Sequence, residues 1–367
     1  MRLDSDLTRG ALGWIDRWTV GAYFADTREK GSYSDSSPYY DATNLATRYH
    51  ASNYAFFGQG AHDLDAHTRV TLGLRTERVN LDGRGTLYTS FGGRVTSSAT
   101  TFRPAFDGNL LGGKLTLEHD LGESRVAFAS VTRGYKAGGI NLDARISPPA
   151  DPLTYGSETL WNYEAGLRGA WLEQRLTGEF TAFYLDRSHT QVRDAAGFGG
   201  SYRFFTSNAH GGRIAGLEAS ARYALTTAWS LHATLATMDS HLDRFTLTNG
   251  NTGGGRRLAN TPRYGATLAT RFRATAGFFA NAELVARGTQ YDSNNQNEER
   301  RAFRTVNAGV GYAWRAWTFT VWGRNVFNAR YEKRVFFFGN ADPDYLPTRY
   351  EDRADPRQFG VSAAYRW

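Results

Sequence analysis

The feature that most constrains this chain is a period-two alternation of apolar and polar residues along almost its whole length. Between residues 213 and 223 one set is apolar and the alternate set is largely polar: Ala215, Leu217, Ala219, Ala221 and Tyr223 against Gly216, Glu218, Ser220 and Arg222. Residues 175–186 and 305–314 repeat the pattern. Successive side chains of a strand point to opposite faces, so each segment predicts a strand with one apolar face. Such segments have roughly the 10 residues that a tilted strand needs to cross a bilayer, whereas strands of soluble sheets average about 5–6.

The spacing of these segments predicts the fold class. We expect fourteen strands, at 14–25, 51–61, 68–79, 106–118, 123–133, 158–169, 173–187, 212–223, 228–239, 262–273, 277–287, 303–314, 317–327 and 357–367. Short turns are expected at 62–67, 119–122, 170–172, 224–227, 274–276 and 315–316, and long loops at 26–50, 80–105, 134–157, 188–211, 240–261, 288–302 and 328–356. This alternation is typical of outer-membrane barrels, which have short periplasmic turns and long extracellular loops. The sequence therefore predicts an all-β, antiparallel transmembrane β-barrel, and an even strand number allows it to close and remove its edges.

The composition agrees with a barrel wall. Mean hydropathy is −0.51, and no run of about 18 apolar residues exists that could form a membrane-spanning helix. Only alternate residues of a barrel strand face lipid, so the average stays polar. Aromatic residues flank the expected short turns, as Trp314 and Trp317 do, which suits the headgroup level of a membrane. A soluble β protein is the alternative, and the apolar strand faces argue against it.

Charge and motifs point away from nucleic acid and from catalysis. The net charge is +7, but the Arg residues are spread evenly, which favours a hydrated wall over nucleic-acid binding. The segment from His62 to His67 lies on an expected turn, where turn chemistry is favoured over a metal site. The acidic segment from Asp292 to Glu299 lacks the glycine of a calcium loop. We therefore expect no metal, no cofactor and no enzyme activity; an enzyme site on a barrel rim remains the alternative.

Several segments, in order and with their spacing, resemble TonB-dependent outer-membrane receptors. The most distinctive is Val131-Thr132-Arg133-Gly134-Tyr135-Lys136-Ala137-Gly138-Gly139-Ile140-Asn141, a strand that runs into a loop. The others are Asn162-Tyr163-Glu164-Ala165-Gly166-Leu167-Arg168-Gly169, Thr261-Pro262-Arg263, Gly323-Arg324-Asn325-Val326-Phe327-Asn328-Ala329-Arg330-Tyr331, and residues 356–367. The resemblance extends over nearly the whole chain.

The resemblance implies the C-terminal part of a plugged barrel of about 22 strands. Residues 1–10, with Arg2-Leu3-Asp4-Ser5, resemble the remnant of an earlier strand, and no part of 1–367 resembles the plug domain. The implied function is transport of a scarce solute, such as a ferric siderophore or similar chelate, across the outer membrane of a Gram-negative bacterium. In the family TonB is engaged through the plug. The alternatives are a plugless passive channel and a non-functional truncated receptor fragment.

The resemblance and the alternation together give candidate site residues. Wall residues expected to face the lumen are Arg175, Glu179, Glu218, Arg222, Arg271, Glu283, Arg287 and Arg324, because a charge facing lipid costs about 2–4 kcal/mol at the bilayer midplane. Loop residues that could hold a metal chelate are Tyr39, Tyr40, Tyr202, Phe204, Phe205, Arg334, Phe336 and Phe337, since aromatic rings stack on planar ligands and Arg pairs with anions.

The last strand carries a further signal. Phe359, Tyr365 and the terminal Trp367 alternate with smaller or polar residues, which looks like the signal read by the outer-membrane barrel assembly machinery. The expected partners are therefore this machinery, outer-membrane lipid, lipopolysaccharide and a small-molecule or metal-chelate substrate, with no nucleic acid.

Overall fold

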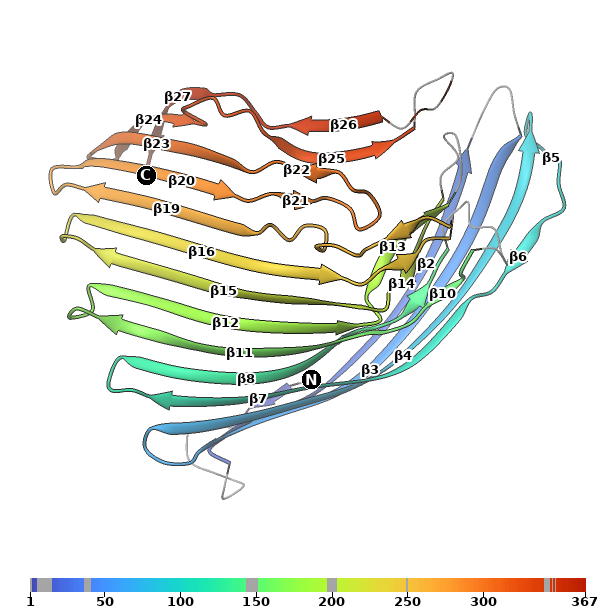
Figure 1. Ribbon diagram of the computed structural model, residues 1–367, viewed down its shortest axis with the longest axis horizontal. Coiled ribbons are helices and arrows are strands. Elements are labelled where there is room, and N and C mark those ends of the chain that lie inside the picture. The colour runs from blue at the N-terminus through green and yellow to red at the C-terminus, as the bar shows by residue number, and fades with distance from the viewer. Residues whose placement is uncertain are drawn as a thin grey trace.

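The computed structural model describes residues 2–4, 15–35, 41–142, 151–196, 203–248, 250–339, 344, 346 and 348–367. A meander of antiparallel strands dominates these residues (Figure 1). Among the described residues, no helix is long and apolar enough to cross a membrane.

The meander begins with the short β1 (Arg2–Asp4), which pairs with β2. Fourteen long strands follow, each paired with the next: β2 (Arg17–Asp35), β3 (Ala42–Asp63), β4 (Thr68–Phe91), β7 (Ala105–Asp120), β8 (Arg125–Lys136), β11 (Glu158–Trp171), β12 (Leu176–Ser188), β15 (Gly211–Ala224), β16 (Trp229–Leu242), β19 (Tyr264–Arg273), β20 (Phe278–Arg287), β23 (Phe303–Trp314), β24 (Trp317–Arg324) and β27 (Gln358–Tyr365).

The shorter strands lie beyond one end of the long ones. β5 (Arg94–Val95) and β6 (Thr100–Phe102) extend the pairing of β4. Five small ladders form within the long connections: β9 (Gly139–Ile140) with β10 (Thr154–Tyr155), β13 (Gln191–Ala196) with β14 (Arg203–Asn208), β17 (Phe245–Thr246) with β18 (Thr252–Gly253), β21 (Gln290–Tyr291) with β22 (Glu299–Arg300), and β25 (Glu332–Phe338) with β26 (Thr348–Arg353). All the short turns therefore lie at one end, and we call the other end the loop end (Figure 1).

The fourteen predicted strands correspond one to one to the fourteen long strands, but the expected loops at 26–50 and 80–105 were wrong. Residues 27–35 belong to β2 and residues 42–50 to β3, and these two strands pair without interruption over 19 residue pairs. Likewise β4 continues to Phe91. Here the outward residues change from apolar to polar while the strands continue. The alternation of apolar and polar residues therefore no longer marks the strands, although their hydrogen-bonded ladder does not end.

The register confirms that one face of the sheet is apolar from strand to strand. Phe180 of β12 lies opposite Ala219, which lies opposite Leu235 and then Ala266. At the far side Val310, Val321 and Val361 form an equivalent row. The large residues of this face are solvent-exposed in the isolated chain. We call this surface the apolar face, and the other surface the polar face. An exposed apolar band of this extent suits a lipid boundary.

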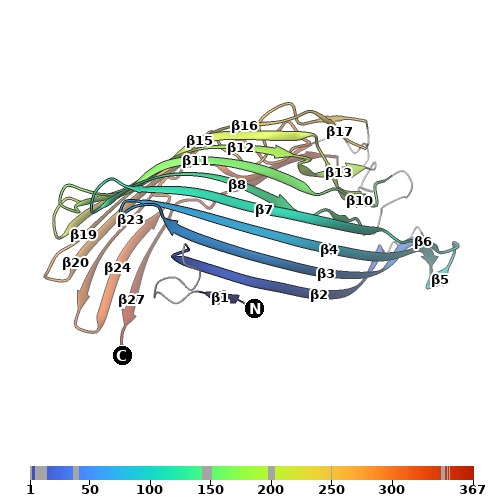
Figure 2. The same cartoon turned by 90° about the horizontal axis from the view of Figure 1, so that it is seen from below.

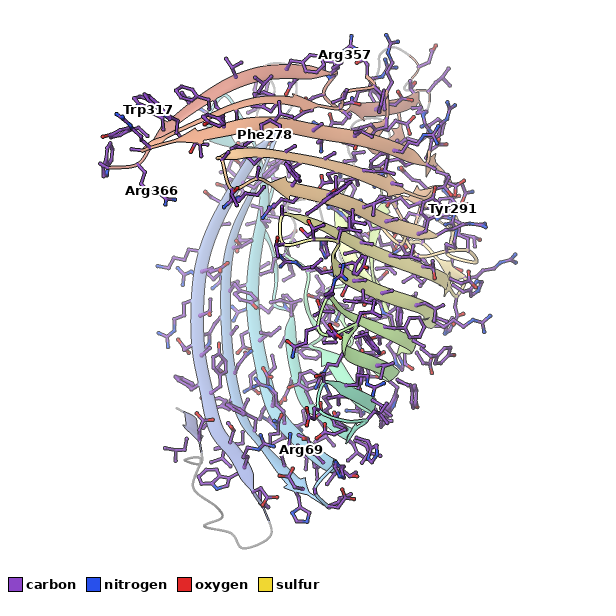
Figure 3. The ribbon with its side chains drawn as sticks, turned by 90° about the vertical axis from the view of Figure 1, so that its left-hand side faces the viewer. Arg69, Phe278, Tyr291, Trp317, Arg357 and Arg366 are labelled. Carbon is purple, nitrogen blue, oxygen red and sulfur yellow. The ribbon has the colours of Figure 1, made fainter. Side chains whose placement is uncertain are left out.

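The sheet is strongly curved and its two edges remain apart. Figure 3, viewed from the short-turn end, and Figure 2 show the curvature. Within the described residues β27 pairs only with β24, and β1 pairs only with β2. Together with β1, the fourteen long strands make a sheet of fifteen, an odd number, and the described strands form no closing ladder.

The buried apolar clusters lie at the loop end. One comprises Ala51, Val79, Leu81 and Leu110 on the polar face of the long strands, with Phe106, Tyr135 and Ile140 packed on it. A second comprises Val192, Ala209, Leu242, Phe245, Leu247 and Leu258 from the connections after β12 and β16 and the strand ends beside them. The loop segments therefore have a packed interior of their own.

Candidate functional site

Seven of the eight predicted wall charges share the polar face. Glu218 lies opposite Thr181, Arg222 opposite His232, and Glu283 opposite Asn307. The same alternation places Glu179, Arg271, Arg287 and Arg324 on this face. A hollow of about 640 Å³ on it is lined by Arg222, His232, Arg271, Arg273, Asn281 and Glu283, among others. The wall thus offers a charged, hydrated surface.

Arg175 lies elsewhere. It precedes β12, in the turn, and its guanidinium donates to the carbonyl oxygens of Ala224 (3.2 Å) and Leu225 (2.7 Å). Its Cζ also lies 5.6 Å from the ring centre of Tyr223. The structure therefore shows Arg175 joining two adjacent short turns, because its strand begins at Leu176 and not at the predicted residue 173.

Sequence reasoning missed a polar cluster on the wall near the loop end. Arg75 and Glu77 of β4 form an ion pair at 2.8 Å. The phenol of Tyr135 donates to Glu77 (2.9 Å) and accepts from Arg75 Nε (3.0 Å), and Asn53 Nδ2 donates to Glu77 (3.3 Å). The alternation identified the face, but the partners are about 60 residues apart in sequence. Which side chains meet across such a separation in sequence is decided only by the register of the sheet.

The segment from Arg133 to Asn141 connects the wall to the loops. Gly134 and Lys136 lie in β8 opposite Leu160 and Glu158, and Arg133 donates to the carbonyl of Leu111. Immediately beyond the strand, a Cβ on Gly138 would lie 2.3 Å from the Phe106 ring. A Cβ on Gly139 would lie 2.3 Å from Tyr155 Oη. Two glycines are therefore needed where the chain passes under neighbouring aromatic rings.

Asn141 links two loops at the end of this segment. Its Nδ2 donates to the carbonyls of Pro152 and Thr206, each at 2.9 Å. Its Oδ1 accepts from the Thr206 amide, also at 2.9 Å. The side chain is buried, so these bonds are costly to lose.

Other loop hairpins are also held together by side chains. Gln296 pairs with the backbone of Phe337 in both directions, donating at 2.6 Å and accepting at 3.0 Å. Asn295 donates to the carbonyl of Arg193. The buried Asp194 accepts from the amide (3.2 Å) and hydroxyl (3.1 Å) of Thr248. We call this assembly of the β13–β14, β21–β22 and β25–β26 hairpins the loop platform.

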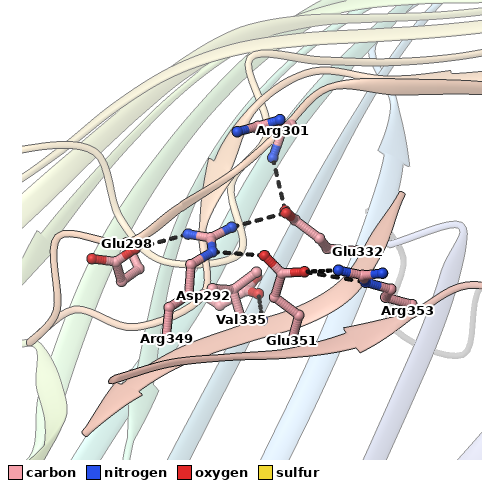
Figure 4. A network of polar contacts seen from close by, with 8 residues as sticks. All are labelled: Asp292, Glu298, Arg301, Glu332, Val335, Arg349, Glu351 and Arg353. Atoms are coloured by element: carbon pink, nitrogen blue, oxygen red, sulfur yellow. Dashed lines mark hydrogen bonds and ion pairs between the residues drawn. The ribbon is translucent and has the colours of Figure 1, made fainter. Parts of the chain in front are cut away.

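Arg349 is the electrostatic centre of the loop platform (Figure 4). Its guanidinium contacts Glu298 (2.8 Å), Glu332 (2.9 Å) and Glu351 (2.9 Å). Hydrogen bonding to Glu351 is the main cause that raises the pKa of Arg349, and the same contact lowers the pKa of Glu351. Nearby, Asp292 accepts from the Val335 amide (2.7 Å) and pairs with Arg300 (3.1 Å). Two loops far apart in sequence are thereby joined.

A second arginine is enclosed by the loop that follows β20. Arg256 lies with its Cζ 4.0 Å from the ring centre of Tyr291, and it donates to the carbonyl of Ser293 (3.1 Å) and to Asn297 (3.0 Å). Burial lowers the pKa of Arg256. Desolvation strengthens cation–π contacts, so this pair stabilises the loop.

The predicted ligand-binding aromatics have different environments. Tyr39, Tyr40 and Tyr202 lie outside the described residues. Phe205 is 4% exposed and packs against Leu153, so in this structure it has almost no surface for a ligand. Phe204 is covered by the guanidinium of Arg193, whose Cζ is 4.3 Å from the ring centre.

The β25–β26 hairpin brings together an aromatic and basic surface. Phe336 stacks on Tyr350 with ring centres 5.7 Å apart, and Arg334 Cζ lies 5.5 Å from the Phe336 ring. Phe337 is 38% exposed. Of the predicted loop residues, Arg334 and Phe336 are thus in contact and Phe337 is adjacent.

The end of the chain lies on the apolar face. Phe359 is opposite Gly323, and Tyr365 is opposite Trp317 with ring centres 5.0 Å apart. Trp367 follows the strand and is fully exposed. This position would leave the three aromatic residues accessible to lipid or to an assembly factor, and the signal itself stays a prediction.

This geometry defines the wall of a membrane β-barrel with its loops assembled at one end. Residues 2–326 match the family model described as TonB dependent receptor-like, beta-barrel. The chain therefore belongs to the TonB-dependent receptor β-barrel family, and the predicted resemblance is confirmed.

Solved structures agree on the fold. The ferric yersiniabactin uptake receptor FyuA of Yersinia pestis matches with a TM-score of 0.77 at 18% identity, over 95% of this chain and 51% of that one. The ferric-catecholate import receptor Fiu of E. coli K12, in its closed form, matches with a TM-score of 0.66 at 15% identity, over 95% of this chain and 55% of that one. The copper transporter OprC matches with a TM-score of 0.66 at 15% identity, over 95% of this chain and 62% of that one. This chain thus spans about half to three fifths of these receptors, all of which are named as receptors or transporters.

Proposed function

We propose that this chain forms barrel wall and external loops of an outer-membrane receptor that takes up a scarce metal chelate, such as a ferric siderophore, in a Gram-negative bacterium. The observation that carries the proposal is the apolar face continuous across fourteen long strands, with all the cross-linked loops at one end. A wall of this kind separates two aqueous compartments, and its loop platform is the part that meets external solutes.

The chemistry of the loop platform supports an anionic, partly planar ligand. Arg334 beside Phe336 and Tyr350 offers a cation and ring faces on one hairpin. An aromatic ring stacks on a catecholate or similar plane, and a guanidinium pairs with its charge. FyuA and Fiu are named for ferric chelates and OprC for copper, so the substrate class we propose is a metal chelate and not one specific metal.

Coupling to TonB through a plug domain, assembly by the barrel assembly machinery and contact with lipopolysaccharide belong to the same proposal. The passive channel is the second candidate. A pore requires a closed ladder, and the described edges at β1 and β27 are unpaired with each other. Single-channel conductance in planar bilayers distinguishes the two candidates directly. A large, steady conductance would support the channel.

Ligand binding tests the receptor. The protein, purified in detergent from outer membranes, is titrated with ferric catecholate, ferric hydroxamate, ferric citrate and cupric chelates while its tryptophan fluorescence is followed. We expect saturable quenching by one class, weakened about tenfold by Arg334→Ala or Phe336→Ala, because one charge-assisted or stacking contact is worth roughly 1–2 kcal/mol. Phe319→Ala on the apolar face is the matched control. Binding by no chelate, or equal loss in the control, would refute the proposal.

A further inference from the structure

The apolar face of the three longest strands changes character toward the loop end. β2, β3 and β4 are 19, 22 and 24 residues long, whereas about 10 residues suffice to cross a bilayer. On β2 the outward residues after Phe24 are Asp26, Arg28 and Lys30. The outward residues of β2 are therefore charged beyond the apolar band. Figure 2 shows β2, β3 and β4 extending past the other strands toward β5.

Three cations form one transverse row on this surface. Lys30 lies opposite Arg48, and Arg48 lies opposite Arg84. All three are exposed. Directly opposed side chains on neighbouring strands have Cβ atoms about 4.5–5.5 Å apart, and like charges at that distance destabilise the sheet. Within the described part of the chain, no hydrogen bond or ion pair involves these three side chains.

The neighbouring rows do not neutralise the three cations. Toward the membrane, Arg28, His50 and Asp82 are in register, and Asp26 contacts both Arg28 (3.1 Å) and His50 (2.7 Å). With His50 neutral, that group carries one net negative charge, which offsets at most one of the three cations. Away from the membrane, the opposed residues are the uncharged Ser32, Ala46 and Thr86. Among the described residues, nearby carboxylates therefore do not fully balance the three cations of the row.

The height of the row indicates what could balance it. Phe24 and Tyr54, with ring centres 5.0 Å apart, are the last aromatic pair of the apolar face on β2 and β3. Lys30 and Arg48 are each six residues farther along, which is roughly 20 Å of strand, or about 14 Å of height at a tilt of about 45°. The phospholipid headgroup layer extends only about 5–8 Å beyond the hydrocarbon. A lipid headgroup that reaches this height would have to be larger than that of a phospholipid.

We propose that the Lys30–Arg48–Arg84 row binds phosphate groups on the saccharide headgroup of lipopolysaccharide in the outer leaflet. The proposal rests on the outer-membrane location proposed above, and not on the chelate. Two guanidinium groups can each donate two parallel hydrogen bonds to a phosphate, and the ammonium adds a point charge. An anion held there would also relieve the repulsion among the three cations.

The test compares two double variants of the protein purified in detergent free of lipopolysaccharide. Arg48→Ala/Arg84→Ala removes two cations of the row. Arg213→Ala/Arg304→Ala removes two exposed cations of the same face, which lie opposite Asp186 and Ala286. Native mass spectrometry measures binding of core-phosphorylated lipopolysaccharide, the same lipopolysaccharide after dephosphorylation, and phosphatidylglycerol. Heat-modifiable gel migration verifies that each variant is folded, and the row variant should fold at least as well as the parent.

We expect the row variant to bind phosphorylated lipopolysaccharide on the order of 30-fold more weakly, and the control to change less than threefold. Dephosphorylation should weaken parental binding to a similar extent and leave the row variant nearly unaffected. Equal losses in both variants, no effect of dephosphorylation, or the same row dependence with phosphatidylglycerol would each overturn the proposal. Chelate titration of the same samples is independent, so a failure of the proposed substrate would not be mistaken for a failure of this site.

Discussion

The phenolic oxygen of Tyr135 lies 2.9 Å from Oε2 of Glu77, although 58 residues separate them in sequence. Glu77 belongs to the wall strand β4, and Tyr135 lies at the end of β8, immediately before the chain turns into a loop. The contact therefore fixes the point from which that loop leaves the wall.

Tyr135→Phe removes this donor and leaves Glu77 with Arg75 and Asn53. We expect a loss of about 1–2 kcal/mol in the free energy of unfolding, because the acceptor is charged and shielded within the polar face. Denaturant titration in lipid vesicles measures it. Tyr163→Phe on the apolar face, whose ring is exposed, should change stability by less than half as much. Equal effects would mean that the phenol bond contributes nothing specific.

Gly138→Ala should destabilise the protein by about 1–3 kcal/mol, because the added methyl group would overpack a closed space. The new Cβ would lie 2.3 Å from the Phe106 ring and 2.5 Å from the Tyr155 carbonyl oxygen, which is backbone and cannot rotate away. Gly265→Ala is the matched control, since nothing lies within 4 Å of its Cβ position. Thermal loss of heat-modifiable migration compares the two, and similar midpoints would contradict the close packing described here.

Leu217→Arg tests which face meets lipid. Leu217 is 46% exposed on the apolar face of β15, and a cation facing lipid near the midplane costs about 2–4 kcal/mol. Ser220→Arg on the polar face of the same strand should cost less than about 1 kcal/mol, because that face is hydrated. Folding yield and unfolding free energy in vesicles give the comparison. A larger cost at position 220 would reverse the assignment of the faces.

Arg349→Ala should release the β25–β26 hairpin from the segment that contains Glu298. The guanidinium is 31% exposed and contacts three carboxylates, so removing it leaves them close together without a counter-charge. We expect a local loss of about 1–3 kcal/mol, between the values for exposed and buried pairs. Hydrogen–deuterium exchange should become faster in residues 288–302 and in β25 and β26, and remain unchanged in β15. Arg349→Lys keeps the positive charge but not the planar guanidinium with its several N–H donors, so it should recover only part of the protection against hydrogen exchange.

The same cluster predicts a response to acid. Hydrogen bonding from Arg349 holds the pKa of Glu351 below its ordinary value of 4.5. The contribution of Glu351 is therefore fully present above about pH 4.5 and is lost as the pH falls through the lower folded-state value. Hairpin protection measured by hydrogen exchange, corrected for intrinsic rates, should decrease between about pH 5 and pH 3. Glu351→Gln should flatten that dependence, and an unchanged slope would assign the titration to another group.

The wall was largely predictable because its signal is local. Apolar alternation gave all fourteen long strands, since lipid requires one apolar residue in every two. It failed above the membrane, where β2–β4 continue with polar outward residues such as Lys30 and Thr86. There the strands persist because neighbouring backbones pair, and a sequence pattern contains no record of that pairing.

The candidate site was less predictable. Arg334 and Phe336 are neighbours in sequence and also in space. Other contacts depend on how separate loops fold against each other, such as those of Arg349 with Glu298 and of Asn141 with Thr206. The burial of Phe205 and the displacement of Arg175 into a turn have the same origin, because exposure and exact strand starts are set by neighbouring segments.

The sequence by itself determined that this chain forms amphipathic strands suited to a membrane wall, because side-chain alternation follows from strand geometry alone. It also determined the family, through residues 131–141 and the segments that follow. The tertiary structure decided which residues of neighbouring strands lie opposite each other, and hence that Lys30, Arg48 and Arg84 form one row. Such a row depends on the register among three strands, which hydrogen bonding across the whole sheet sets and no single strand encodes.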